Sequence, residues 1–145
     1  MESPSRVTVG VTLLTGALVT LAACSSDTTG SDDTPQPECT GPVGPVQVAV
    51  SSGTSPTFSW TPACRLFFLN VEPTGAGPDQ WNAISDGANA IETPVQYGVV
   101  PPNARQLTPV VTPLQSGTSY TVYVFRWTGP GSQDGVLIGS QSFTP

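Results

Sequence analysis

The sequence predicts an all-β protein: a single antiparallel sandwich that follows an export region and a polar linker. Short runs of β-branched and aromatic residues recur between residues 46 and 143, and prolines and glycines separate them. No stretch in this part has the apolar period and the caps of a helix. The chain has 145 residues, and its part from residue 46 to 145 is long enough for one small core.

The strand candidates differ in how their apolar residues are spaced. VQVAV (46–50) and TFSW (57–60) alternate with period two, as strands with one buried face do. RLFFLNV (65–71) is apolar on both faces, as a central strand would be, and SYTVYVFRW (119–127) is the strongest strand signal. Weaker candidates are WNAIS before the Asp86-Gly87 turn, ARQLTPVV and VLIGSQSF. About seven strands with turns between them predict a sandwich.

Two motifs in this region resemble the fibronectin type III family. Residues 114–120 (LQSGTSY), followed by alternating valines, are similar to its tyrosine corner, in which the hydroxyl of Tyr120 would bond to the backbone upstream. Residues 55–63 (SPTFSWTPA) are similar to its second strand, with a buried tryptophan and a following proline. The resemblance implies a fibronectin type III-like sandwich over residues 46–145. Residues 72–105 depart from the family because they are long and rich in Pro and Gly.

The N-terminal region predicts export and a lipid anchor. Val7–Leu21 is apolar and uncharged after Arg6, as a signal peptide is. Leu21–Cys24 (LAAC) resembles the lipobox of bacterial lipoproteins. The resemblance implies that residues 1–23 are cleaved, that the Cys24 thiol carries diacylglycerol, and that a further acyl chain such as palmitate is attached to its amino group. Two or three chains anchor a protein stably, whereas one does not. An ordinary secretory signal or a single-pass anchor is the alternative.

The cysteine count supports this interpretation. The chain has three cysteines, and an odd number in an exported protein needs an explanation. If Cys24 carries lipid, then Cys39 and Cys64 remain as a disulfide pair in an oxidising compartment, with two free buried thiols as the alternative. Residues 24–45 are rich in Ser, Thr, Asp, Pro and Gly, which predicts a disordered acidic linker. The expected location is the bacterial cell envelope, and for a Gram-negative cell the outer membrane, facing the periplasm or the exterior.

Composition excludes several function classes. The formal charge is −6 and the chain has four arginines but no lysine, so it lacks the basic surface that nucleic-acid binding needs. Without histidine or lysine there is no Ser/His, Cys/His or Schiff-base chemistry. No cofactor and no metal are expected, because Asp79, Asp86 and Asp134 fit turns better than calcium ligands. Glu72 and Glu92 show no glycosidase spacing.

The tyrosine corner predicts which side chains face outward. Tyr120, Val122 and Val124 would point inward, and so would Phe67, Leu69 and Val71 on the neighbouring strand. The outward apolar patch would then comprise Leu66, Phe68, Tyr123, Phe125 and Trp127. Such a patch marks an interaction surface if it is uncovered. The favoured alternative is that residues 72–105 fold over it with Trp81, Ile84, Val95 and Tyr97.

These observations predict a non-catalytic envelope lipoprotein that is bound to the membrane through Cys24. Its sandwich would present an interaction or structural module to a protein or glycan partner. The alternative function is a carbohydrate-binding module at the cell surface. Its sugar-stacking platform would be formed by Trp81, Tyr97 and Trp127.

Overall fold

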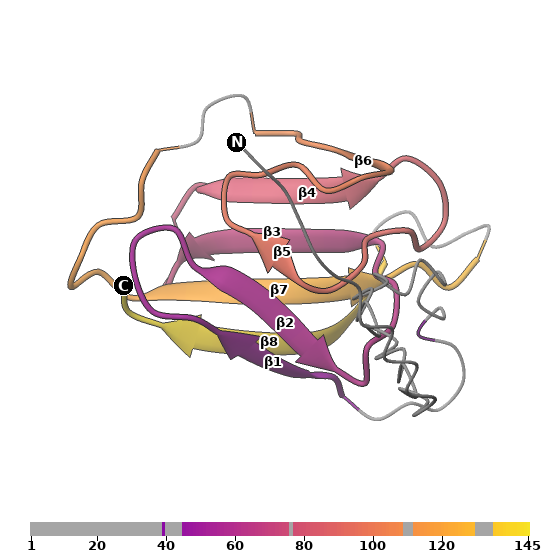
Figure 1. The fold of residues 1–145 in the computed structure, drawn as a ribbon, viewed down its shortest axis with the longest axis horizontal. Helices are drawn as coiled ribbons and strands as arrows, with labels where there is room; N and C mark the ends of the chain where they lie inside the picture. The colour runs from indigo at the N-terminus through magenta and orange to yellow at the C-terminus, as the bar shows by residue number, and fades with distance from the viewer. Residues whose placement is uncertain (1–38, 40–44, 76, 109–111, 130–134) are drawn as a thin grey trace, which may run out of the picture. The chain divides into compact units, whose positions relative to one another are not determined.

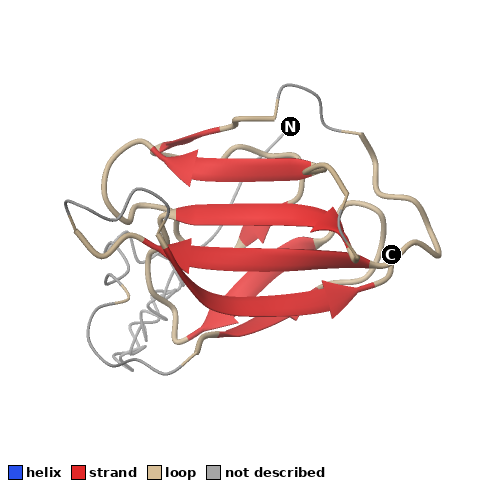
Figure 2. Ribbon diagram, turned by 180° about the vertical axis from the view of Figure 1, so that it is seen from behind, coloured by secondary structure: helices blue, strands red, loops and turns tan. Residues whose placement is uncertain are grey.

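The computed structural model describes Cys39 and residues 45–75, 77–108, 112–129 and 135–145. Their strands form two antiparallel sheets, so the predicted sandwich is confirmed (Figure 1). The three-stranded sheet has the order β1 (Gln47–Val50), β2 (Thr57–Thr61) and β5 (Val95–Gln96). The five-stranded sheet, nearest the viewer in Figure 2, has the order β6 (Ala104–Arg105), β4 (Trp81–Ser85), β3 (Phe68–Pro73), β7 (Tyr120–Arg126) and β8 (Val136–Phe143). Among the described residues, no helix is long and apolar enough to cross a membrane.

The core lies between the two sheets, where alternate residues of each strand meet. Phe58 and Trp60 of β2 are buried, while the residues between and beside them are half-buried or exposed. In β7, the buried residues Tyr120, Val122 and Val124 confirm the predicted inward face. Each apolar side chain buried in this way stabilises the fold by roughly 1.5–3 kcal/mol relative to exposure, so the alternation of these strands sets the layering.

The alternation slips at the start of β3, and one prediction is wrong there. Leu66 was expected outward but its side chain is 0% exposed, whereas Phe67, expected inward, is half-buried. The cause is an irregularity in the strand: Phe68 pairs with Phe125, and the Phe67 N–H also donates to the Phe125 carbonyl. Two residues therefore oppose one, as in a β-bulge. Leu66 is turned inward and exchanges backbone hydrogen bonds with Ile91.

Residues 72–105 build the sandwich and do not fold over its outer face. Trp81 pairs with Val71 and Val95 pairs with Phe58, so both share the inward faces of their partners. Trp81, Val95 and Tyr97 are accordingly buried in the core. The prediction that they cover the outer face is wrong, because cross-strand partners point to the same side of a sheet.

The predicted tyrosine corner is present before β7. The backbone N–H of Gln115 donates to the Tyr120 hydroxyl at 3.1 Å. The Thr118 N–H donates to the Gln115 carbonyl, which closes a four-residue turn with Gly117 at its third position. Gly117 has φ +80°, a left-handed conformation that glycine adopts without strain. The motif therefore fixes how the chain enters β7.

The two sheets approach each other closely along β1 and β8. The Val46 N–H, directly before β1, donates to the Ile138 carbonyl at 2.7 Å. The register between β7 and β8 shifts at Val124/Phe125, which brings Gly139 against the Val46 carbonyl. A Cβ at Gly139 would lie 2.6 Å from that backbone oxygen, so only glycine fits there without a shift of the chain.

We expect Gly139→Ala to lower the free energy of unfolding by about 1–3 kcal/mol, the usual cost of overpacking. Gly87→Ala is the matched control, because a Cβ there meets no atom within 4 Å and should change stability by less than about 0.5 kcal/mol. Urea unfolding followed by tryptophan fluorescence measures both. Equal stability of the two variants would contradict the close approach of β1 and β8.

Candidate functional site

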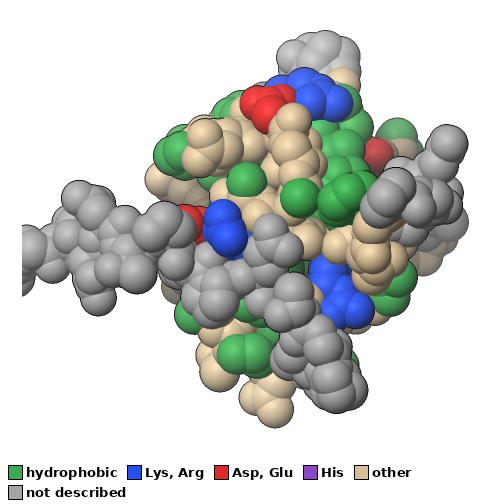
Figure 3. Space-filling view, turned by 90° about the vertical axis from the view of Figure 1, so that its right-hand side faces the viewer, with side chains coloured by type: hydrophobic (Ala, Val, Ile, Leu, Met, Phe, Trp, Pro, Cys, Tyr) green, Lys and Arg blue, Asp and Glu red, His purple; other side chains and the backbone are tan. Residues whose placement is uncertain are grey.

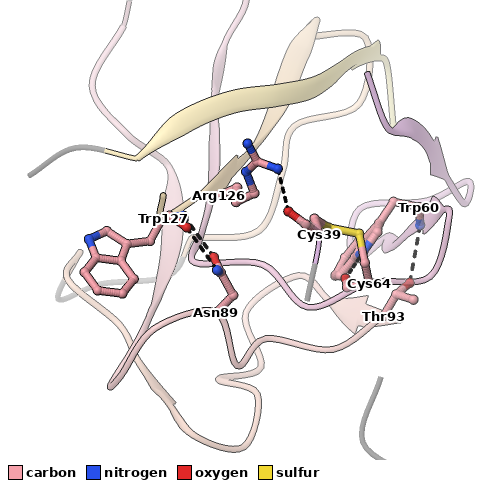
Figure 4. The surroundings of a disulfide bond; sticks show 7 residues. All are labelled: Cys39, Trp60, Cys64, Asn89, Thr93, Arg126 and Trp127. Carbon is pink, nitrogen blue, oxygen red and sulfur yellow. Dashed lines mark hydrogen bonds between the residues drawn. A yellow bond between two sulfur atoms is a disulfide. The ribbon is translucent and has the colours of Figure 1, made fainter. Parts of the chain in front are cut away.

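The predicted disulfide joins Cys39 to Cys64, with 5.0 Å between their Cα atoms. Both residues are buried, and their carbonyls are bound from two sides (Figure 4). The indole N–H of Trp60 donates to the Cys64 carbonyl at 2.6 Å, and Nη1 of Arg126 donates to the Cys39 carbonyl at 2.6 Å. Trp60 belongs to the three-stranded sheet and Arg126 to the five-stranded one, so the bridge is held by both layers.

Trp127 lies at the same end of the sandwich, directly after β7. Its backbone N–H donates to Oδ1 of Asn89 at 2.9 Å, and its carbonyl accepts from Nδ2 of Asn89 at 3.1 Å (Figure 4). Asn89 is buried, whereas the side chain of Trp127 is half-buried. The two hydrogen bonds fix the backbone that presents the indole. We call this region, which includes the disulfide, Arg126 and Trp127, the disulfide end.

The outer face of the five-stranded sheet carries an apolar row rather than a broad patch. Phe68 pairs with Ile84 on one side and Phe125 on the other, and Phe125 pairs with Leu137. The rings of Phe68 and Phe125 lie 5.4 Å apart. Because cross-strand partners share a face, these residues form one line across the sheet. We call Ile84, Phe68, Phe125 and Leu137 the apolar row.

The row next to it is polar. Tyr123 pairs with Asn70 and Ser140 on the same outer face. The carboxylate of Asp79 accepts a hydrogen bond from the amide of Asn70 at 3.0 Å and from that of Asn82 at 3.2 Å. The predicted patch is thus narrower than expected: Phe68, Tyr123 and Phe125 are half-buried on this face, Trp127 belongs to the disulfide end, and Leu66 is in the core.

The predicted sugar platform does not form. The rings of Trp81 and Tyr97 are 5.6 Å apart, but their side chains are only 0% and 3% exposed. The Tyr97 hydroxyl donates to the Thr112 carbonyl at 2.8 Å. Trp127 lies apart from this pair, next to Asn89. A stacking platform needs exposed ring faces, so this prediction is wrong for Trp81 and Tyr97.

The carboxylates considered in the sequence do not come together. Glu72 is near the far end of β3, and Glu92 follows Ile91, which pairs with Leu66 before β3 begins. Leu66 and Glu72 are six residues apart along the chain, or roughly 20 Å in an extended strand. Asp79 and Asp86 flank β4 at opposite ends, and Asp134 lies outside the described residues. The described residues contain no group of three potential metal ligands.

Two contacts at the disulfide end and one member of the apolar row could not be predicted from the sequence. The Asn89–Trp127 and Arg126–Cys39 contacts join residues 38 and 87 positions apart. Leu137 is found on the apolar row only once the register of β7 and β8 is known. An isolated strand pattern carries no such information.

No protein-family model matches this chain, and no curated protein or solved structure matches it either. The class of protein is therefore defined by its own geometry. In the part of the chain that the structure describes, it is a small antiparallel β-sandwich with a disulfide between Cys39 and Cys64.

Removing the bridge should destabilise the sandwich. For a sequence separation of 25 residues, the chain-entropy relation gives about 3–4 kcal/mol, so we expect the double variant Cys39→Ser, Cys64→Ser to lose this amount. Cys24→Ser is the matched control and should unfold like the unchanged chain. Urea unfolding without reductant gives the free energies. A double variant as stable as the control would contradict a stapling role for the bridge.

The stability of the fold should also depend on Tyr97 at alkaline pH. Burial, with a smaller contribution from Tyr120, raises the pKa of Tyr97 from 10.0 to about 12. The folded state therefore holds this proton more tightly, and the stabilisation is complete below pH 10 and lost as the pH rises toward 12. The loss should stay below about 2–3 kcal/mol, because solvent partly screens the Tyr97 hydroxyl.

The free energy of unfolding, measured between neutral pH and pH 12, tests this expectation. Tyr97→Phe should show a shallower decline above pH 10, although it is less stable at neutral pH because the bond to Thr112 is lost. Tyr123→Phe retains Tyr97 and should keep the steep decline. The same slope in all three proteins would show that Tyr97 does not titrate as its burial requires.

Proposed function

We propose that this chain is a bacterial envelope lipoprotein, anchored in a membrane through acylated Cys24. Its sandwich serves as a non-catalytic interaction or structural module. The observation that carries the proposal is the pairing of the cysteines. The sequence has three cysteines, and two of them, Cys39 and Cys64, are joined to each other. The third, Cys24, is the last residue of the lipobox-like LAAC.

The disulfide supports export as well as lipid attachment. Structural disulfides persist in oxidising compartments and are rare in the cytosol of most organisms. A bond that is buried and held by Trp60 and Arg126 fits a structural role rather than a transient redox one. Both properties agree with a signal peptide that directs the chain out of the cytoplasm.

The described side chains favour binding over catalysis. The outer face offers the half-buried Phe68 and Phe125 beside the half-buried Asn70. Aromatic rings next to hydrogen-bonding groups are typical of protein-interaction surfaces. Glu72 and Glu92 lie too far apart to act as the carboxylate pair of a glycosidase. The carbohydrate-binding alternative has no specific support, because Trp81 and Tyr97 are buried.

Lipid attachment is tested by growing an expressing bacterium with radiolabelled palmitate. We expect label in the full-length protein and recovery of the protein in the membrane fraction. Cys24→Ser should abolish both. The double variant Cys39→Ser, Cys64→Ser is the matched control, since it changes two cysteines and leaves the labelled one. An unlabelled protein released into the medium, with its signal cleaved elsewhere, would contradict the proposal.

A further inference from the structure

We propose that the disulfide end of the sandwich is a membrane-facing surface that lies against the headgroup and upper acyl region of a phospholipid bilayer. The inference rests on the proposed lipid attachment at Cys24. It adds an orientation: one end of the domain, which includes Leu137 of the apolar row, contacts the bilayer, and the opposite end faces away from it.

The length of the N-terminal segment supports this orientation. Cys24 and Cys39 are 15 residues apart, and a chain of that length spans at most about 50 Å. Cys39 is bonded to Cys64, so the segment joins the domain at the disulfide end and not at the first strand. The seven residues of β7 span roughly 23 Å, which separates the two ends of the sandwich. A lipid on Cys24 would therefore restrain the disulfide end more closely than the opposite end, whose path from the lipid is longer by about one strand.

The side chains at the disulfide end suit a membrane interface. Val136 and Leu137, at the start of β8, are 47% and 49% exposed, and Val136 pairs with Arg126. The half-buried indole of Trp127 follows Arg126 directly. Tryptophan is enriched at the level of the headgroups because its ring is apolar and its N–H is polar. Aliphatic side chains beside it can enter the upper acyl region.

A shallow cleft adjoins these residues. Its volume is about 510 Å³, and it opens beside β8, next to the start of β1. The lining combines one arginine with aliphatic side chains and backbone, which fits a lipid headgroup with the upper part of its chains better than a fully polar ligand. The lining residues are Pro45, Val46, Arg126, Val136, Leu137, Ile138, Gly139 and Ser140.

The three arginines of the described residues also lie at the disulfide end. Arg65 follows Cys64, Arg126 donates to the Cys39 carbonyl, and Arg105 pairs with Ile84 at the end of the apolar row nearest β6. Figure 3 looks onto this end, where basic, acidic and hydrophobic side chains all reach the surface. Arg105 also forms an ion pair with Asp86 at 2.7 Å.

At the opposite end the described charges are acidic. Glu72 pairs with Thr121 near the start of β7, and Asp79 precedes β4. Asp86 and Glu92 also lie at the disulfide end, so a bilayer that contains anionic lipid attracts its three arginines only weakly, but it repels the opposite end. The net charge of the chain is −6, so this effect orients the domain and does not by itself bind it to the membrane.

The surface is held firmly enough to act as a unit. The disulfide, the Arg126–Cys39 bond and the two Asn89–Trp127 bonds join the segment before β1, the end of β7 and the loop after β4. An acidic stretch of the N-terminal segment, which includes Asp32 and Asp33, is the competing occupant of the basic surface. The exposed Val136 and Leu137 favour the bilayer, because an acidic peptide would leave them in water.

Quenching of tryptophan fluorescence by brominated lipid tests the orientation. The lipidated full-length protein is reconstituted into vesicles of phosphatidylethanolamine and phosphatidylglycerol, with or without bromine on the upper acyl chain. We expect a loss of emission with the brominated lipid that disappears in Trp127→Phe, since Trp60 and Trp81 are buried in the core. Trp127→Phe should fold, because both Asn89 bonds are to the backbone of residue 127.

A tryptophan at the opposite end is the matched control. Ser116 is exposed in the turn before β7, so Ser116→Trp in the Trp127→Phe background places an indole there. We expect no quenching from it. Equal quenching from both positions, or none from Trp127 in a protein that floats with the vesicles, would overturn the orientation while leaving the lipid anchor intact. A protein without palmitate that does not float would overturn the anchor and the orientation together.

Discussion

The bond between Cys39 and Cys64 is the constraint on which the rest of this molecule depends. It fastens the segment before β1 to the residues that follow β2, and the two cysteine carbonyls accept hydrogen bonds from Trp60 and Arg126. Because these donors belong to different sheets, one covalent bond fixes the entry of the chain relative to both layers. Cys39 is therefore fixed at one end of the sandwich, beside the end of β7.

The two faces of the five-stranded sheet differ in burial: the inner face belongs to the core, and the outer face is only partly buried. In β7, Val122 and Val124 fill the core, while Tyr123 and Phe125 lie on the outer face. Residues 72–105 add to both: Trp81 completes the core and Ile84 extends the apolar row. The burial of large apolar side chains stabilises the fold, while the apolar row lies half-buried or exposed on the outer face.

The composition limits what such a surface can do. A chain without histidine or lysine has few groups that can transfer a proton or attack a bond near neutral pH, and the described carboxylates are separated or engaged in hydrogen bonds and ion pairs. Recognition by this domain would then depend on shape, apolar contact and hydrogen bonds. The lipid anchor proposed above would concentrate a weak binding surface of this kind at a membrane.

The sequence by itself determined the sandwich, the inward faces of β2 and β7, the tyrosine corner and the pairing of Cys39 with Cys64. These features follow from period-two alternation, from turn chemistry and from cysteine counting, all of which act over short stretches or on few candidates. Only the tertiary structure decided that Leu66 is buried, that Trp81 and Tyr97 belong to the core, and that Asn89 holds Trp127. Each of these depends on a bulge or on a contact between residues far apart in the chain, and neither is encoded in the pattern of a single strand.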